Sequence, residues 1–164
     1  MILRFAVLTV SDRSARGERP DASGPALVEL IKAQGWEVTR RDVLPDDLNI
    51  LRETMIAWVD RGDADIILTT GGTGFAPRDV TPEATRAVIE REAPGLAEAM
   101  RAASGSKSPH AMLSRAIAGI RGKVLIVNLP GSPKAAVENL QVVMSALEHA
   151  VQLLHEDPHA EAGH

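Results

Sequence analysis

A glycine-rich loop between a short apolar run and a proline-led helix start constrains the fold of this chain most. The apolar run at 65–69 is rich in β-branched residues, which is typical of a fully buried strand. It leads to Gly-Gly-Thr-Gly at 71–74, and Thr81-Pro82-Glu83 then supplies an N-cap, a first-turn proline and an acidic first turn. A strand, a glycine loop and a helix N-terminus in this order form a place where an anion can bind.

The glycine loop could instead be an ordinary tight turn. Its three glycines allow positive φ and leave backbone N–H groups uncovered; they are Gly71, Gly72 and Gly74. The Arg78-Asp79 pair follows within a few residues. Three glycines in four positions, followed by this charged pair, favour an anion site over a plain turn.

Hydrophobic periodicity predicts alternating strands and helices. We expect strands at 3–10, 36–43, 65–69, 114–120 and 123–129, and helices at 23–35, 47–59, 81–92, 96–103 and 134–154. This order predicts one three-layer α/β/α sandwich over residues 1–155, with a mostly parallel sheet and one strand reversed by a hairpin at Arg121-Gly122. Residues 156–164 are predicted to form a disordered tail.

Composition excludes several classes of function. Two Trp, two Phe and no Tyr argue against stacking platforms for single-stranded nucleic acid, and a net charge of −4 disfavours non-specific binding to a duplex. Without cysteine there is no disulfide, thiolate metal site or cysteine nucleophile. The apolar run at 1–10 is too short for a membrane span and predicts a first strand, so we expect a cytoplasmic protein without membrane or nucleic-acid partners.

Four polar loops each follow a predicted strand. They lie at 11–13, 44–47, 70–79 and 128–134. Because the carboxyl ends of parallel strands share one edge of the sheet, these loops should converge on a ligand site. The sequence lacks a Walker loop, a Rossmann fingerprint and a nucleophile elbow, so the site is of another kind.

Two aspartates in these loops are candidate magnesium ligands. Asp46 could cap the next helix, but Asp47 could do so equally well and leave Asp46 free. Asp79 could simply pair with Arg78 on the surface. Mg²⁺ takes one or two carboxylates together with phosphate oxygens. Two carboxylates beside a glycine anion loop therefore predict that Asp46 and Asp79 hold Mg²⁺.

Other loop residues leave alternatives open. Ser11 and Thr73 could bond their own loops or contact a phosphate or ring. Asn128 ends a buried strand, where it could orient a ligand or lock a neighbouring loop. Ser132 and Lys134 stand at the start of the last helix, where an anion is favoured.

Several motifs together resemble the MoaB/Mog family of molybdenum cofactor biosynthesis proteins. The most specific is Gly-Gly-Thr-Gly-x3-Arg-Asp-Val-Thr-Pro-Glu at 71–83. Shorter motifs match in the same order at 10–13, 45–47, 93–95, 100–101, 113–115 and 128–133. The likeness runs from about Leu3 to Leu154, and the short length resembles the MoaB branch.

The resemblance implies Mg-ATP-dependent adenylylation of molybdopterin with release of pyrophosphate. Asp46 and Asp79 match the family's catalytic carboxylates for Mg²⁺. The positions implied or predicted to bind substrate and nucleotide are Ser11, Asp12, Gly71, Gly72, Thr73, Gly74, Arg78, Ser104, Ser114, Asn128, Gly131, Ser132 and Lys134.

The resemblance also implies a homo-oligomer, either a trimer or a hexamer, and other molybdenum cofactor biosynthesis proteins as candidate partners. Two other functions stay open from sequence. A non-catalytic molybdopterin carrier or scaffold would not need both Asp46 and Asp79. A nucleotide pyrophosphate hydrolase of the CinA type would share the Gly-Gly-Thr-Gly loop and cleave a dinucleotide instead.

Overall fold

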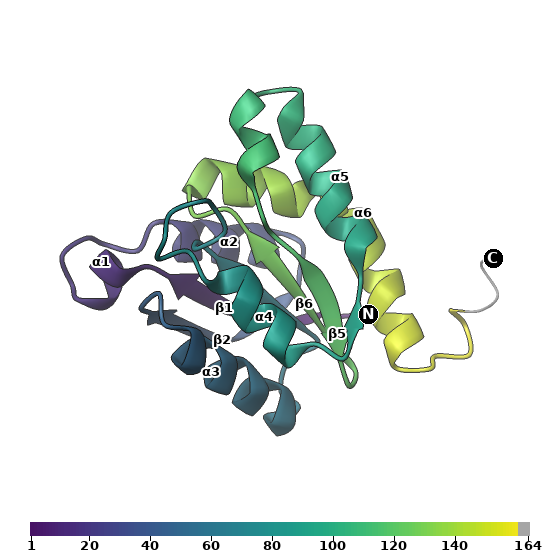
Figure 1. Cartoon of the computed structure of the whole chain (residues 1–164). Coiled ribbons are helices and arrows are strands. Elements are labelled where there is room, and N and C mark those ends of the chain that lie inside the picture. Colours follow the sequence, from purple (N-terminus) through teal and green to yellow (C-terminus); the bar gives the residue numbers. More distant parts are fainter. Residues whose placement is uncertain (161–164) are drawn as a thin grey trace.

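The computed structural model describes residues 1–160, which form three layers around a six-stranded sheet (Figure 1). Across the sheet the strands run in the order β2-β1-β3-β6-β5-β4. Their bounds are β1 Arg4–Val10, β2 Glu37–Leu44, β3 Ile66–Thr70, β4 Arg91–Glu92, β5 Ala118–Arg121 and β6 Val124–Leu129. The predicted mostly parallel α/β/α sandwich is confirmed.

Strand direction brings the predicted loops together. The strands β2, β1, β3 and β6 are parallel neighbours, whereas β5 runs antiparallel to both β6 and β4. The loops that follow the four parallel strands therefore lie at one edge of the sheet. Backbone bonds tie them in pairs: Ser11 N donates to Leu44 O at 2.9 Å, and Gly71 N donates to Leu129 O at 3.1 Å.

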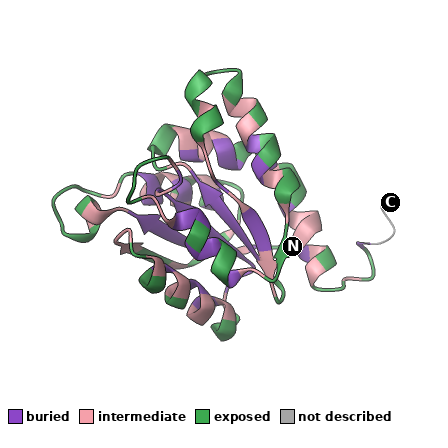
Figure 2. Ribbon diagram, viewed as in Figure 1, coloured by how far each residue is buried: buried purple, intermediate pink, exposed green. Residues whose placement is uncertain are grey.

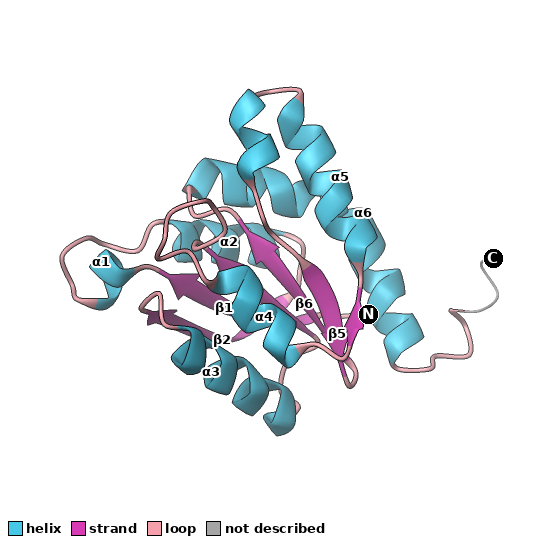
Figure 3. Ribbon diagram, in the orientation of Figure 1, coloured by secondary structure: helices cyan, strands magenta, loops and turns pink. Residues whose placement is uncertain are grey.

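Helices cover both faces of the sheet (Figure 3). They are α1 Asp12–Ala15, α2 Ser23–Ala33, α3 Leu48–Arg61, α4 Thr81–Val88, α5 Pro94–Gly105, the 3-10 helix η1 Pro109–Leu113 and α6 Pro133–Leu154. Residues of α2, α5 and α6 form one apolar core with one face of the sheet, and residues of α3 and α4 form a second core with the other face.

The alternation of side chains along β1 explains why two cores are needed. Phe5 and Val7 belong to the core under α2 and α6, whereas Ala6 and Leu8 belong to the core under α3. Successive side chains of a strand point to opposite faces, so a strand apolar at every position must be covered on both sides. Figure 2 shows the resulting buried sheet between helices that are exposed outside.

The predicted helix at 81–92 ends earlier, at Val88. Ile89 adopts an extended backbone, Glu90 N donates to Ile120 O at 2.8 Å, and Arg91–Glu92 then pairs with β5 as the edge strand β4. Strand pairing with β5 thus replaces the last helical turn. The prediction missed this two-residue strand because it has no pattern of its own.

Two other local predictions need correction. Residues 114–117 are not part of β5, because Arg115 N donates to Thr73 O at 2.8 Å and so joins this segment to the glycine loop. The hairpin between β5 and β6 is present, but its turn residues are Gly122 and Lys123, with Arg121 paired opposite Val124. Gly122 has φ +57°, which glycine adopts without the strain that other residues would have.

The predicted tail falls partly outside the described residues. Residues 156–160 form turns after α6, and the Ala160 side chain is buried. Residues 161–164 lie outside the described part of the chain, and their disorder stays a prediction. Among the helices described, none has the length and apolarity needed to cross a bilayer.

Candidate active site around the glycine loop

The glycine loop has the conformation that its sequence predicts at two of its three glycines. Gly71 has φ +106° and Gly72 has φ +69°, whereas no positive φ occurs at Gly74. The loop is held from α4, because Thr81 Oγ1 donates to Gly71 O at 2.8 Å and Thr81 N donates to Gly72 O at 3.1 Å. From the other side, Thr70 Oγ1 donates to Pro130 O at 2.7 Å. The loop is therefore fixed between the ends of β3 and β6 and the start of α4.

Side chains would not fit at these two glycines. A Cβ at Gly71 would meet the carbonyl oxygen of Val10, and a Cβ at Gly72 would meet the Thr81 hydroxyl and lie 3.1 Å from Asp46 Oδ1. Positive φ adds strain for any other residue. The loop backbone is thus packed closely against Val10, Thr81 and Asp46, and only glycine fits at these two positions.

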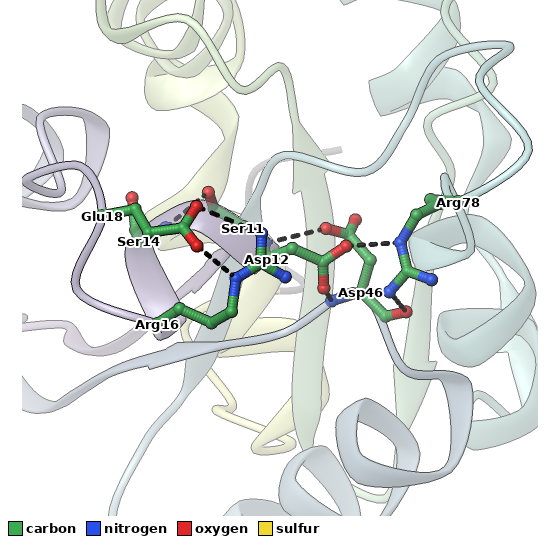
Figure 4. A network of polar contacts seen from close by, with 7 residues as sticks. All are labelled: Ser11, Asp12, Ser14, Arg16, Glu18, Asp46 and Arg78. Atoms are coloured by element: carbon green, nitrogen blue, oxygen red, sulfur yellow. Dashed lines mark hydrogen bonds and ion pairs between the residues drawn. The ribbon is translucent and has the colours of Figure 1, made fainter.

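Asp12 and Asp46 lock two of the converging loops to each other (Figure 4). Asp12 N donates to Asp46 Oδ2 at 3.1 Å, and Asp46 N donates to Asp12 Oδ1 at 3.0 Å. Of the two candidate caps, Asp47 is the one that caps α3, since Asp47 Oδ1 accepts from Ile50 N at 3.0 Å. The carboxylate of Asp46 is therefore available at the glycine loop.

Arg78 pairs with Asp12 rather than with Asp79. Its Nε donates to Asp12 Oδ2, and its Nη2 lies 3.4 Å from the carbonyl oxygen of Asp46. Asp79 instead accepts from Ala76 N at 3.0 Å through Oδ2, which lies beside Gly74. The simple alternative of an Arg78–Asp79 surface pair is thus not what the structure shows.

The two linked aspartates have opposite pKa shifts. The hydrogen bond from Arg78 lowers the pKa of the Asp12 carboxyl, whereas burial raises the pKa of Asp46, with repulsion from Asp12 and Asp79 acting in the same direction. A raised carboxyl pKa means that charge on Asp46 is unfavourable in the free protein. A cation bound here would relieve this cost.

Two cavities open on either side of the glycine loop. The first has a volume of about 780 Å³, and the predicted residues that line it are Ser11, Asp12, Asp46, Gly71, Gly72, Asp79, Gly131 and Ser132. The second has a volume of about 330 Å³, and the predicted residues that line it are Thr73, Gly74, Ser104 and Ser114. The predicted residues are therefore brought together in two groups that meet at one loop.

The second cavity lies between α5, η1 and the first turns of α6. Its lining is mainly small and apolar, with Ala97, Met100 and Leu113 among its walls. Its polar groups hold one another: Asn139 Nδ2 donates to Ser104 Oγ at 3.1 Å and to Ala135 O at 2.7 Å. Such a cavity suits a ring that is recognised by a few placed polar groups.

Three predicted residues line neither cavity. Arg78 lies at the surface above Asp12, and Lys134 is exposed on the first turn of α6. Asn128 is fully buried: its Oδ1 accepts from Ile117 N, and its Nδ2 donates to Thr69 and Thr85 hydroxyls at 2.9 Å. Of the two alternatives for Asn128, this geometry favours the lock on a neighbouring segment. Ligand contacts by these three residues stay predictions.

Sequence reasoning missed several residues of the site. Arg13 and Arg19 line the first cavity, and Arg101 and Asn139 line the second. Arg115 holds the loop itself: its Nε donates a hydrogen bond to Gly74 O at 2.7 Å, and its Nη2 donates to Asp79 O at 2.8 Å. Arg13 and Arg115 stand inside motifs that already matched the family, so they could have been found. Asn139 could not, because it lies within a helix read for its apolar periodicity.

The residues at the first cavity fit a magnesium ion that is also held by a ligand. Within residues 1–160, no cluster of three or more His, Asp or Glu side chains is arranged to hold a metal alone. Asp46 and Asp79 nevertheless line the same cavity and repel each other electrostatically. Mg²⁺ needs only one or two protein carboxylates when phosphate oxygens complete its shell.

Comparison with known proteins gives consistent results. A family model described as "Probable molybdopterin binding domain" matches residues 6–149. The molybdopterin adenylyltransferase of Helicobacter pylori is 39% identical over 154 residues, which are 93% of this chain and 88% of that protein. A crystal structure of the molybdopterin biosynthesis enzyme MoaB from Thermus thermophilus has a TM-score of 0.89 at 48% identity and covers 96% of this chain and 99% of its own.

One relative is much longer than this chain. The molybdenum cofactor synthesis protein cinnamon of Drosophila melanogaster is 44% identical over 157 residues, which are 94% of this chain. This chain spans only 26% of that protein.

Proposed function

The chain belongs to the family of probable molybdopterin binding domains, as its motifs predicted, and from this premise we propose that it is a molybdopterin adenylyltransferase. The reaction joins the terminal phosphate of molybdopterin to the adenylyl group of ATP and releases pyrophosphate. One observation supports this proposal above all: consecutive residues of a single loop line two cavities of different character. A reaction between two substrates needs both of them at one place.

The division of the loop suggests which substrate each cavity takes. The first cavity is the larger, about 780 Å³, and is lined by carboxylates and by Gly71 and Gly72, which have no side chains, and this suits a nucleotide with its cation. The second, about 330 Å³, is mainly apolar with Ser104 and Ser114 in its wall, which suits a pterin ring. The pterin phosphate would then lie near Thr73, between the two.

The chemical step needs no covalent side chain. An oxygen of the pterin phosphate forms a bond to the α-phosphorus of ATP, the bond from that phosphorus to the bridging oxygen breaks, and the electron pair leaves with pyrophosphate. Asp46 and Asp79 would hold Mg²⁺, which when bound neutralises phosphate charge. The role of the chain is to position the reacting groups. The hydrogen bonds between Asp12 and Asp46 would fix where the carboxylates lie, and the loop backbone, held by Thr81 and Arg115, would approach the phosphates.

Mixing the purified protein with molybdopterin and Mg-ATP tests the proposal. We expect adenylylated pterin and pyrophosphate in equal amounts. Tight pterin binding without product would support the carrier or scaffold instead. Cleavage of a dinucleotide without any need for pterin would support a CinA-type hydrolase.

We further propose that the protein works in the cytoplasm as a homo-oligomer, a trimer or a hexamer. This part rests on the resemblance to the MoaB/Mog proteins. Light scattering at micromolar protein concentration tests it. A monomer alone would contradict it.

A further inference from the structure

Most arginines of this chain are already held by the protein. Eight arginines form ion pairs with carboxylates: Arg4, Arg16, Arg40, Arg41, Arg52, Arg78, Arg86 and Arg115. Two others, Arg101 and Arg121, donate hydrogen bonds to backbone carbonyls. Within residues 1–160, four arginines are held neither by an acid nor by a backbone carbonyl: Arg13, Arg19, Arg61 and Arg91. Two of these four, Arg13 and Arg19, line the first cavity.

Both of these arginines belong to one short segment that runs from α1 to the start of α2 (Figure 1). Arg13 lies in α1, and Arg19 lies in the following loop, where its Nη2 donates to Ser11 Oγ at 3.2 Å. Arg16, between them in sequence, is instead paired with Glu18 at 2.8 Å, as Figure 4 shows. Arg13 and Arg19 therefore line the cavity without an acidic partner, whereas Arg16 has one.

The charges of the cavity are arranged in two zones. Arg13 and Arg19 are exposed, whereas the Asp12 side chain is only 15% exposed and Asp46 is half-buried. Because Arg78 already pairs with Asp12, the inner zone owes its negative charge to Asp46, and the arginines form an outer positive zone. A ligand that fills both zones must carry a cation at one end and unneutralised negative charge at the other.

A nucleoside triphosphate with its divalent cation has this distribution of charge. We infer that Arg13 and Arg19 bind the β- and γ-phosphates of the nucleotide and hold pyrophosphate as it forms. The inference rests on the proposed adenylyl transfer and assigns its leaving group. When the bond between the α-phosphorus and the bridging oxygen breaks, the electron pair stays on pyrophosphate, and guanidinium forks are well suited to this added phosphate charge.

This assignment predicts how the protein discriminates between nucleotides. AMP lacks the groups that Arg13 and Arg19 contact, so it should bind weakly and without help from them. ATP should gain affinity from both arginines. Free pyrophosphate should compete with ATP at the same place.

The experiment compares Arg13→Gln, Arg19→Gln and the double variant with wild type. Arg16→Gln is the matched control, because it removes the same charge from the same segment at a residue held by Glu18. Calorimetric titration with Mg-ATP, AMP and pyrophosphate gives the three affinities, and thermal unfolding confirms that each variant is folded. We expect each single variant to weaken ATP and pyrophosphate binding about tenfold, equal to about 1.4 kcal/mol.

AMP binding and the KM for molybdopterin should stay within twofold in all of these variants. ATP affinity unchanged in the double variant would overturn the inference and leave the proposed adenylyl transfer standing. An equal loss in Arg16→Gln would also overturn it, because net charge alone would then explain the effect. A wild-type protein that binds neither ATP nor pyrophosphate would overturn the proposed function, and the inference with it.

Discussion

The two cavities beside the glycine loop use charge in opposite ways. In the first, Asp46 is free of the helix cap, and Arg13 and Arg19 have no carboxylate partner. In the second, both cationic side chains are held by the protein: Lys107 pairs with Glu138 at 3.3 Å, and Arg101 donates to the carbonyl oxygen of Ala116 at 2.6 Å. The first cavity therefore lacks partners that a charged ligand can supply, whereas the second offers shape and a few polar groups. This contrast teaches that one loop can serve two chemically different substrates.

The largest effect should come from a carboxylate of the first cavity. Asp79→Asn should lower adenylyl transfer about 1,000-fold, which corresponds to about 4 kcal/mol of transition-state stabilisation, because the lost charge weakens Mg²⁺ binding. Pterin binding in the second cavity should stay close to wild type. The measurement is the initial rate at saturating Mg-ATP.

The control for this variant is Asp47→Asn. Asp47 caps α3 and lines neither cavity, and asparagine caps as well as aspartate. Wild-type rates are expected for it. Near-normal turnover in Asp79→Asn would reject a metal role for Asp79.

The next effect concerns the loop backbone itself. Gly72→Val would place a branched side chain against Thr81 and Asp46 at φ +69°, so ATP affinity should fall about 100-fold or more. Because the apolar strands carry most of the burial, unfolding should stay cooperative, with a loss of only about 1–3 kcal/mol. Calorimetric titration and chemical denaturation measure the two quantities.

Gly95→Val is the matched control for this variant, since Gly95 lies in α5 with open space beside it and no positive φ. Wild-type ATP binding is expected there. If Gly72→Val binds ATP as wild type does, the loop is only a turn.

A smaller effect should appear in the second cavity alone. Ser104→Ala removes a hydroxyl that Asn139 holds at 3.1 Å, so molybdopterin affinity should fall about fivefold, in line with about 1 kcal/mol for one hydrogen bond. ATP affinity should not change. Ser106→Ala, an exposed neighbour outside this cavity, is the control. If Ser104→Ala lowered the affinity for ATP more than the affinity for molybdopterin, the assignment of the two cavities would have to be reversed.

The smallest effect is on stability and depends on pH. Burial raises the pKa of Asp46 in the folded protein, so the folded state binds more protons than the unfolded state near that pKa. This contribution to stability is present at acid pH and is lost as pH rises through the folded pKa. Asp46→Asn should therefore raise stability slightly at neutral pH and should add less at acid pH.

Thermal unfolding of both proteins over a pH series measures this difference. The amide oxygen of asparagine can still accept the bond from Asp12 N, so the loop lock is kept. A lower midpoint for Asp46→Asn at neutral pH would contradict the raised pKa.

Local patterns predicted the parts of this molecule that depend on local causes. The strands β1, β3 and β6 are buried on both faces, and their apolar sequences indicated this directly. The Gly71–Gly72 conformation was predicted for the same reason, because only glycine takes positive φ there without strain. The sequence also offered Asp47 as a second cap for α3, which is the residue that caps this helix in the structure.

Pairings between distant segments could not be predicted. The Arg78–Asp12 ion pair joins residues far apart in sequence. Nothing in the sequence around Arg78 indicates that its partner is Asp12 and not the adjacent Asp79. The hydrogen bonds from Arg115 to Gly74 and Asp79 also join residues far apart in sequence. Because of them, the segment expected to begin a strand instead supports the glycine loop. The division of the site into two cavities likewise depends on how distant segments pack, so the sequence could not predict which residues line which cavity.

Titration of ATP onto protein saturated with pterin tests the central claim most directly. A non-cleavable α,β-methylene analogue of ATP, with Mg²⁺ present, prevents turnover during the measurement. If the two cavities hold the two substrates, the analogue should bind one site per chain with an affinity within about threefold of that for free protein, equal to about 0.7 kcal/mol. Displacement of pterin by the analogue would show that both ligands share one cavity and would contradict the account.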